Sequence, residues 1–184
     1  MSIPLLDHEL ADDEIAWMAD VYAAFAAARP AHADPREALR DVLGRPEFQL
    51  EKPIDLTGNG VWRGGRNKHG RNVAGVFLPR VELHRHNYSR TDQFAMYVRG
   101  EADAFSVENG EPVLTPVTGG AHFHNAPGAP HAFLPKVGQP VPADWEIAFI
   151  AITPRNLQED TAAVAEETKA LYQRVTGTVA PVGV

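Results

Sequence analysis

Histidines gather in the middle of this sequence, and the spacing of three of them suits the binding of a metal ion. Five of the eight histidines lie between residues 83 and 133: His84, His86, His122, His124 and His131. Side chains two positions apart in a β-strand point to the same face, so His84 and His86 would present two imidazoles together. His131 follows a Pro-Gly turn and would supply a third from another strand. The alternative is that they are polar residues on a solvated strand face.

Helices are expected on both sides of this stretch. In residues 11–28, apolar side chains recur every three or four positions, and acidic residues at the start suit the helix dipole. A second helix is expected after the N-cap Asp34, with Pro35 in its first turn, and it should end at Gly44. Residues 157–175 show the helical periodicity again and predict one C-terminal helix.

Between these helices, short apolar runs alternate with glycine, proline and asparagine, which is typical of an antiparallel sandwich or barrel. Asn109-Gly110 predicts a tight hairpin turn. The expected strands are 48–56, 61–62, 73–78, 81–86, 94–99, 101–107, 112–118, 121–124, 131–134 and 145–153. The chain is therefore divided into a helical segment (1–46), a β-barrel (47–155) and a C-terminal helix with its tail (156–184).

A first motif in this region resembles that of the cupin superfamily, in which His-x-His is followed by a glutamate and then a glycine. Here His84 and His86 are followed by Gln93, which lies seven positions before Gly100. Gln93 thus occupies the glutamate position, reached through a loop two residues longer than usual. Leu78 stands where the motif begins with glycine.

The second cupin motif, a glycine followed by a Pro-x-Gly turn and a histidine, is matched by Gly120, Gly128 and His131. Two positions depart from it, because Ala126 stands where proline is expected and Pro135 replaces an asparagine. Both motifs occur in order with a plausible spacer between them, so the resemblance is specific enough to assign a fold.

The resemblance covers residues 75–153 and implies a mainly β fold, a single cupin (jelly-roll) β-barrel with two N-terminal helices and one C-terminal helix. It also implies one divalent metal ion bound by His84, His86, His131 and Gln93. Gln93 is the main departure, because a neutral amide coordinates weakly and takes no proton. Three neutral histidines leave the ion's charge uncompensated, which favours an anionic substrate bound directly to the metal. The alternative for Gln93 is a hydrogen-bonding role behind the ligands.

Three further residues are candidates for proton transfer. Tyr97 shares the parity of Gln93 and is expected to point into the barrel, unless it is simply a core aromatic residue. His122 and His124 form a second His-x-His pair, and one of them would line the pocket as a general acid or base. Strand register decides which of the two faces inward, and the alternative for both is a polar strand at the barrel rim.

Two residues are candidates for binding the substrate. Arg63 belongs to a basic cluster at residues 62–71 and suits carboxylate or phosphate recognition. It is expected to point inward because Trp62 would face the other way, and the alternative is a solvated hairpin. Tyr88 lies in the lengthened loop beside the predicted metal ligands, and its alternative is a plain loop residue.

Composition excludes several classes of function. The net charge of −7 argues against broad nucleic-acid binding, and the absence of cysteine excludes disulfides and thiolate ligands. No apolar run approaches the length of a membrane span, and the N-terminus does not resemble a secretory signal, so a cytoplasmic location is expected. The resemblance to cupins implies a homodimer.

The expected function is metal-dependent catalysis on a small anionic organic molecule. An Fe(II)-type oxygenase is favoured, because three nitrogen ligands leave open positions where substrate and dioxygen would bind side by side. One alternative is a lyase or isomerase that uses Zn, Ni or Mn as a Lewis acid, with a tyrosine or histidine as base. The other is a non-catalytic cupin that binds a small ligand, although a pure binder would not need the three histidines.

Overall fold

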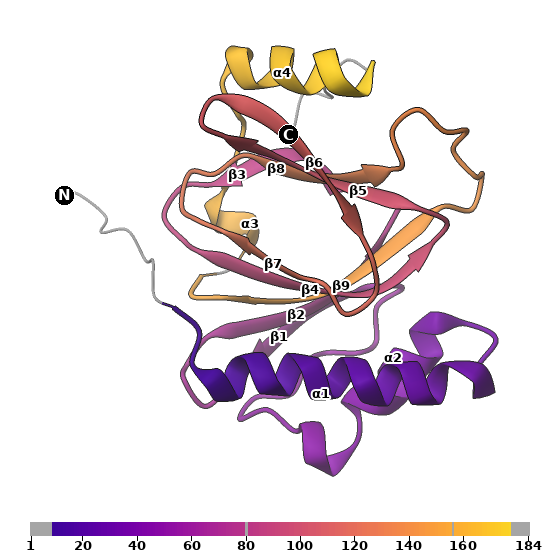
Figure 1. Cartoon of the computed structure of the whole chain (residues 1–184). Helices are drawn as coiled ribbons and strands as arrows, with labels where there is room; N and C mark the ends of the chain where they lie inside the picture. Colours follow the sequence, from indigo (N-terminus) through magenta and orange to yellow (C-terminus); the bar gives the residue numbers. More distant parts are fainter. Residues whose placement is uncertain (1–8, 80, 156, 178–184) are drawn as a thin grey trace.

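The computed structural model describes residues 9–79, 81–155 and 157–177, and consists of two facing antiparallel sheets with helices outside them (Figure 1). The first sheet has the order β1-β2-β9-β4-β7 and the second β10-β3-β8-β5-β6. The first contains β1 (Val61–Arg66), β2 (Asn72–Leu78), β9 (Glu146–Thr153), β4 (Thr91–Arg99) and β7 (His122–Asn125). The second contains β10 (Thr161–Ala162), β3 (Val81–His86), β8 (His131–Pro135), β5 (Ala102–Glu108) and β6 (Glu111–Val117). The expected mainly β fold is confirmed.

Two N-terminal helices cover the outer face of the first sheet (Figure 1). α1 (Asp12–Ala28) lies where the apolar periodicity predicts it, and it buries Met18 and Phe25 against the sheet. α2 (Pro35–Leu43) begins after Asp34, whose carboxylate accepts the backbone N–H two residues further on at 2.8 Å. Short 3-10 turns at 29–31 and 46–48 follow the two helices.

The predicted C-terminal helix is wrong in its middle. The chain forms α3 (Leu157–Asp160), then β10, then α4 (Glu166–Thr176). Thr161 pairs with His86 on the edge of the second sheet, so the backbone there bonds to β3 instead of continuing a helix. α4 then packs on the outer face of the second sheet through the buried Tyr172.

The predicted strand at residues 48–56 is also wrong. This segment runs beside β1 but makes only isolated bridges, Lys52 with Arg66 and Asp55 with Arg63. The predicted hairpin is confirmed, because residues 109–110 join β5 to β6 with positive φ angles of 52° and 79°.

The apolar core has three layers. A helix-side cluster joins α1 and α2 to outward-facing residues of the first sheet, including Phe77 and Phe94. A central cluster lies between the two sheets and contains Phe133 and Phe149. The third cluster lies between the second sheet and α4. Membership of these clusters shows to which side of a sheet a given strand residue points.

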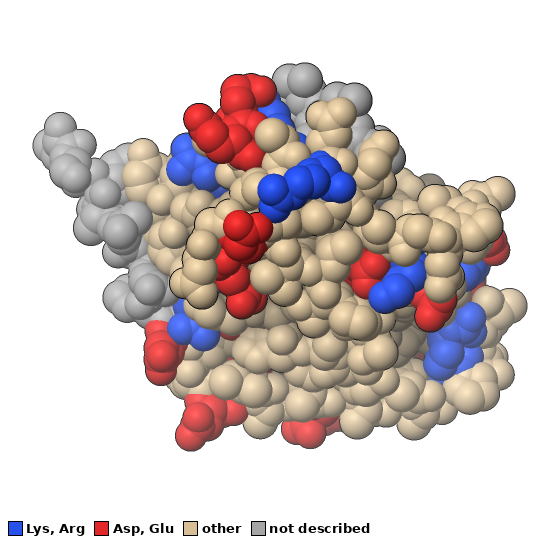
Figure 2. Space-filling model, turned by 45° about the horizontal axis from the view of Figure 1, so that its top comes forward, with Lys and Arg blue, Asp and Glu red and all other residues tan. Residues whose placement is uncertain are grey.

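Charges on the face that carries α4 are mixed. Figure 2 shows acidic and basic side chains in small groups of both signs around a larger uncharged area. An ion pair joins α4 to the β5–β6 hairpin, with Arg174 and Glu111 3.0 Å apart. No helix within the described residues has the length and apolar character needed to cross a membrane.

Candidate metal centre

Three histidines converge on the inner face of the second sheet. β3 and β8 are neighbouring strands, and His84 lies directly opposite His131 in their register. A register shift between Val81 and His84 brings His84 and His86 to the inner side. The backbone carbonyl of His86 accepts the N–H of Gly128 at 2.6 Å, which ties the turn before His131 to β3. One ring nitrogen of each histidine lies within 4.8 Å of those of the other two.

Hydrogen bonds leave ring nitrogens of this triad free. His84 donates from Nδ1 to the carbonyl of Glu82 at 2.7 Å, and His131 donates from Nδ1 to the carbonyl of Ala129 at 3.1 Å. Because a carbonyl only accepts, Nε2 of each ring carries the lone pair. Nε2 of His131 and both nitrogens of His86 are buried and have no hydrogen-bond partner among the described residues. Unpaired buried nitrogens are costly, and these fit the lone-pair donors of a divalent metal site.

Burial keeps the triad neutral. It lowers the pKa of His84, and together with the neighbouring His84 it lowers the pKa of His86 to about 4. Burial is also the main reason why the pKa of His131 lies well below its usual value, with His84 and His86 adding to the effect. Neutral imidazole is the form that binds metal, so near pH 7 the site needs no deprotonation before binding.

Gln93 faces the space between the sheets. Along β4, Phe94 belongs to the helix-side cluster and Ala95 to the central cluster, so alternation places Gln93 on the inner side. Its Oε1 accepts a hydrogen bond from Nδ2 of the buried Asn125 at 3.0 Å. Asn125 was missed from the sequence, because it lies beyond the second His-x-His pair with no motif to mark it. Coordination by Gln93 stays a prediction.

His122 and His124 do not line the metal pocket, and the expectation that one of them does is wrong. Phe123, which lies between them in β7, packs against Phe133 in the central cluster at a ring distance of 5.1 Å. The two histidines therefore point to the helix side. There His122 Nε2 lies 2.9 Å, and His124 Nδ1 3.6 Å, from the carboxylate of the buried Asp92.

Tyr97 also faces the helix side, which corrects the expectation that it points into the barrel. A register shift in β4 between Ala95 and Tyr97 reverses the alternation that started at Gln93. The Tyr97 ring lies 6.4 Å from that of Phe77, and its hydroxyl accepts a hydrogen bond from Arg99 at 2.9 Å.

Of the two predicted substrate-binding residues, Arg63 lies away from the barrel interior and Tyr88 lies on its border. Trp62 packs on the helix side as expected, but Arg63 is exposed on the edge strand β1 and lines surface hollows. Tyr88 is half-buried in the loop after β3. Its backbone N–H donates to Asp160 at 3.1 Å, and the guanidinium of Arg155 lies 5.6 Å from its ring. Substrate binding by either residue stays a prediction.

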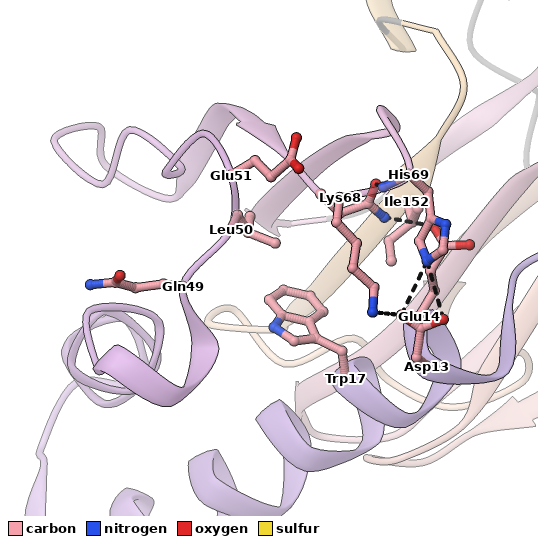
Figure 3. A pocket seen from close by; sticks show the side chains of 10 residues that line it. Asp13, Glu14, Trp17, Gln49, Leu50, Glu51, Lys68, His69 and Ile152 are labelled. Atoms are coloured by element: carbon pink, nitrogen blue, oxygen red, sulfur yellow. Dashed lines mark hydrogen bonds and ion pairs between the residues drawn. The ribbon is translucent and has the colours of Figure 1, made fainter.

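A cavity of about 300 Å³ lies elsewhere, beside α1 (Figure 3). Trp17, Leu50 and Ile152 form its apolar part. On its rim, Asp13 pairs with Lys68 at 2.8 Å and with His69 at 3.1 Å. Ile152 belongs to the helix-side cluster, so the first sheet separates this cavity from the three histidines.

Comparisons with known proteins give fold likenesses at low identity. No protein-family model matches the chain, and no curated protein matches it. A cupin-2 domain from Rhodospirillum rubrum is 13% identical, with a TM-score of 0.44, over 67% of this chain and 70% of that one. A cupin-like protein from Thermotoga maritima is 17% identical, with a TM-score of 0.39, over 63% and 84%. A double-stranded β-helix protein from Klebsiella pneumoniae is 15% identical, with a TM-score of 0.39, over 68% and 94%.

These TM-scores are below 0.5, so the description of the fold rests on the chain itself. Its two antiparallel sheets face each other, and the second sheet places the motif histidines His84, His86 and His131 side by side on the inner face. The glutamine at the position of the motif glutamate also points inward, from the opposite sheet. The residues of both motifs therefore converge in space between the two sheets, which is the arrangement that the resemblance to cupins predicts.

Proposed function

We propose that this protein is a mononuclear metal-dependent enzyme that acts on a small anionic organic molecule. The observation that carries the proposal is the set of buried, unpaired ring nitrogens in the triad of His84, His86 and His131. Three neutral ligands bring no negative charge to a divalent ion, so an anionic substrate would supply the charge that the ligands lack. The amides of Gln93 and Asn125 would orient that substrate from the opposite sheet.

Within this class we propose an Fe(II)-type oxygenase. Fe(II) would supply dioxygen chemistry, and that chemistry does not require a protein base. The lyase or isomerase alternative with Zn, Ni or Mn is expected to use a tyrosine or histidine as base. The three residues expected to serve as bases, Tyr97, His122 and His124, all lie on the helix side of the first sheet, across it from the triad. Their placement supports the oxygenase over the Lewis-acid alternative.

The test begins with the metal content of protein purified without added metal. We expect one equivalent of metal, and we expect His86→Ala to remove it. His122→Ala is the matched control, because it changes a histidine on the outer side of the same barrel and should keep the metal. A wild-type protein that binds no divalent ion in titrations would overturn the enzyme proposal in favour of a non-catalytic ligand-binding cupin.

Oxygen uptake then separates the two kinds of enzyme. Anaerobically iron-loaded protein is mixed with a panel of small carboxylates and enolizable acids, and dioxygen consumption is followed with an electrode. Uptake with one substrate class, lost in His86→Ala, is the expected result. Turnover of a panel member by Zn- or Ni-loaded protein without dioxygen uptake would instead establish the Lewis-acid alternative.

A homodimer is also proposed, on the resemblance to cupins alone, and sedimentation velocity tests it.

A further inference from the structure

Asp160, the last residue of α3, holds the loop that follows His86. Its side chain is 2% exposed. One carboxylate oxygen accepts the backbone N–H of Tyr88 at 3.1 Å, and the other accepts that of Ser89 at 2.9 Å. Its backbone carbonyl accepts the N–H of Asn87 at 3.0 Å. Three consecutive amides after a triad histidine therefore converge on one acidic residue.

The same residue is fixed next to His86 itself. Thr161, which follows Asp160 in the chain, is the β-sheet partner of His86 in the pairing of β10 with β3. The carboxylate is therefore held beside the backbone that follows His86, although among the described residues it is not part of the group whose atoms would contact the ion.

Among the described residues, Asp160 also lacks the cationic partner that the buried Asp92 and Asp103 have. Asp92 is paired with Arg90 at 2.8 Å, and Asp103 with Lys136 at 2.8 Å. Within the described ranges, the hydrogen bonds to the Asp160 carboxylate come from backbone N–H groups, and no ion pair to it is found. Buried charges are normally paired or placed near metals, and a metal ion at the triad would supply a positive charge on the side of His86.

We propose that Asp160 provides the counter-charge of the metal centre that Gln93 does not provide, and that it acts through His86 and the 87–89 loop without being a ligand. The inference rests on the proposed metal centre. In this arrangement α3 and β10 belong to the metal centre. They bring a negative charge to one side of the triad and leave the inner side open to substrate. Asp160 is a positioning residue, and its effect can be measured without substrate, as the affinity of the protein for metal.

The experiment measures zinc affinity by competition with a chromophoric chelator, and urea unfolding of the metal-free protein. Asp160→Asn removes the charge and keeps one acceptor oxygen, and we expect it to weaken zinc binding about 10- to 100-fold, the range seen for groups behind metal ligands. Asp103→Asn is the matched control, since it changes a buried aspartate on the outer face of the same sheet. It should unfold more easily but bind zinc like the wild type.

Asp160→Glu separates charge from loop support. It keeps the carboxylate but strains the bonds to Tyr88 and Ser89, so we expect a lower stability with zinc affinity nearer to the wild type than that of Asp160→Asn. Equal loss of affinity in the Glu and Asn variants would overturn the inference in favour of simple loop support. If Asp160→Asn does not fold, Asp160→Ser is the second neutral variant for the same comparison.

The outcomes also distinguish this inference from the function on which it rests. Zinc binding by Asp160→Asn at wild-type affinity would refute the role of Asp160 while the metal centre stands. An equal loss in Asp103→Asn would refute it too, because the effect would then be general destabilisation. If the wild type itself binds no zinc, or His86→Ala binds it equally well, the proposed metal centre fails first.

Discussion

Replacing His86 by leucine is expected to stabilise the metal-free protein. In the part of the chain that the structure describes, both ring nitrogens of His86 are buried without a hydrogen-bond partner, and one such atom costs about 1–3 kcal/mol. Leucine fills a similar volume without polar atoms. The rings of His84 and His131, at 5.0 and 5.3 Å from that of His86, keep their own nitrogens and lose a polar neighbour. We therefore take the low end of that cost, about 1 kcal/mol for each of the two nitrogens, and expect the free energy of unfolding to rise by about 2 kcal/mol.

With metal present the order should reverse. Free zinc at a thousand times the dissociation constant stabilises the wild type by about 4 kcal/mol, whereas the variant has lost one of three histidine ligands. The assay is thermal and urea unfolding near neutral pH, with chelator and with zinc. In chelator, the melting temperature of His86→Leu should rise by roughly 4–8 °C, at about 2–4 °C per kcal/mol for a domain of this size.

His122→Leu serves as the control, because His122 is bonded to Asp92 outside the barrel and should lose stability in both conditions. A His86→Leu protein that is less stable than the wild type in chelator would refute the reasoning. Its imidazole nitrogens would then have partners in the metal-free fold.

Three further outcomes are expected from urea unfolding of the metal-free protein. The pKa of His86 falls from 6.5 to about 4 on folding, so between these pH values the unfolded chain binds a proton that the folded chain does not. The free energy of unfolding should therefore fall by about 3 kcal/mol as the pH drops from 6.5 to 4. His86→Leu should flatten that part of the pH profile. Phe133→Ala opens a cavity between the sheets and should cost about 3–5 kcal/mol; a loss under 1 kcal/mol would mean that this core is loosely packed. Gly120→Ala should cost more than about 1 kcal/mol, because its φ is +87° and a Cβ would lie 2.8 Å from the Tyr22 ring, and wild-type stability would contradict the contact with α1.

The convergence of the three histidines was predictable because it depends on local patterns. Two-residue spacing fixes the common face of His84 and His86, and the Pro-Gly turn marks the start of the strand that carries His131. The cupin motifs then specify which strands meet. Helix α1 and α2 were predictable for a similar reason, since periodicity and the Asp34 cap are local signals.

The prediction of the proton-transfer residues was wrong because the alternation of side chains along a strand can be interrupted. One register shift in β4 turns Tyr97 to the opposite face from the one that counting from Gln93 gives, and no residue type marks the shift. For His122 and His124, the burial of Phe123 between the sheets decides the register. That preference depends on Phe133, a partner distant in sequence.

The C-terminal helix failed for a related reason. Residues 157–175 carry a helical pattern, but the exposed edge of β3 offers hydrogen bonds to Thr161. A free strand edge is a property of the assembled sheet, so the competition is visible only in three dimensions.

The pairing of β3 with β8 has a consequence for the chain as a polymer. A metal ion held by His86 and His131 would close a loop of about 45 residues in a protein that has no cysteine and therefore no covalent cross-link. A permanent cross-link over such a loop removes roughly 4 kcal/mol of chain entropy from the unfolded state. An ion that stayed bound to both ligands during unfolding would act as a reversible staple of this kind. Metal loading should then slow proteolysis of the unfolded chain, as a disulfide does in a secreted domain.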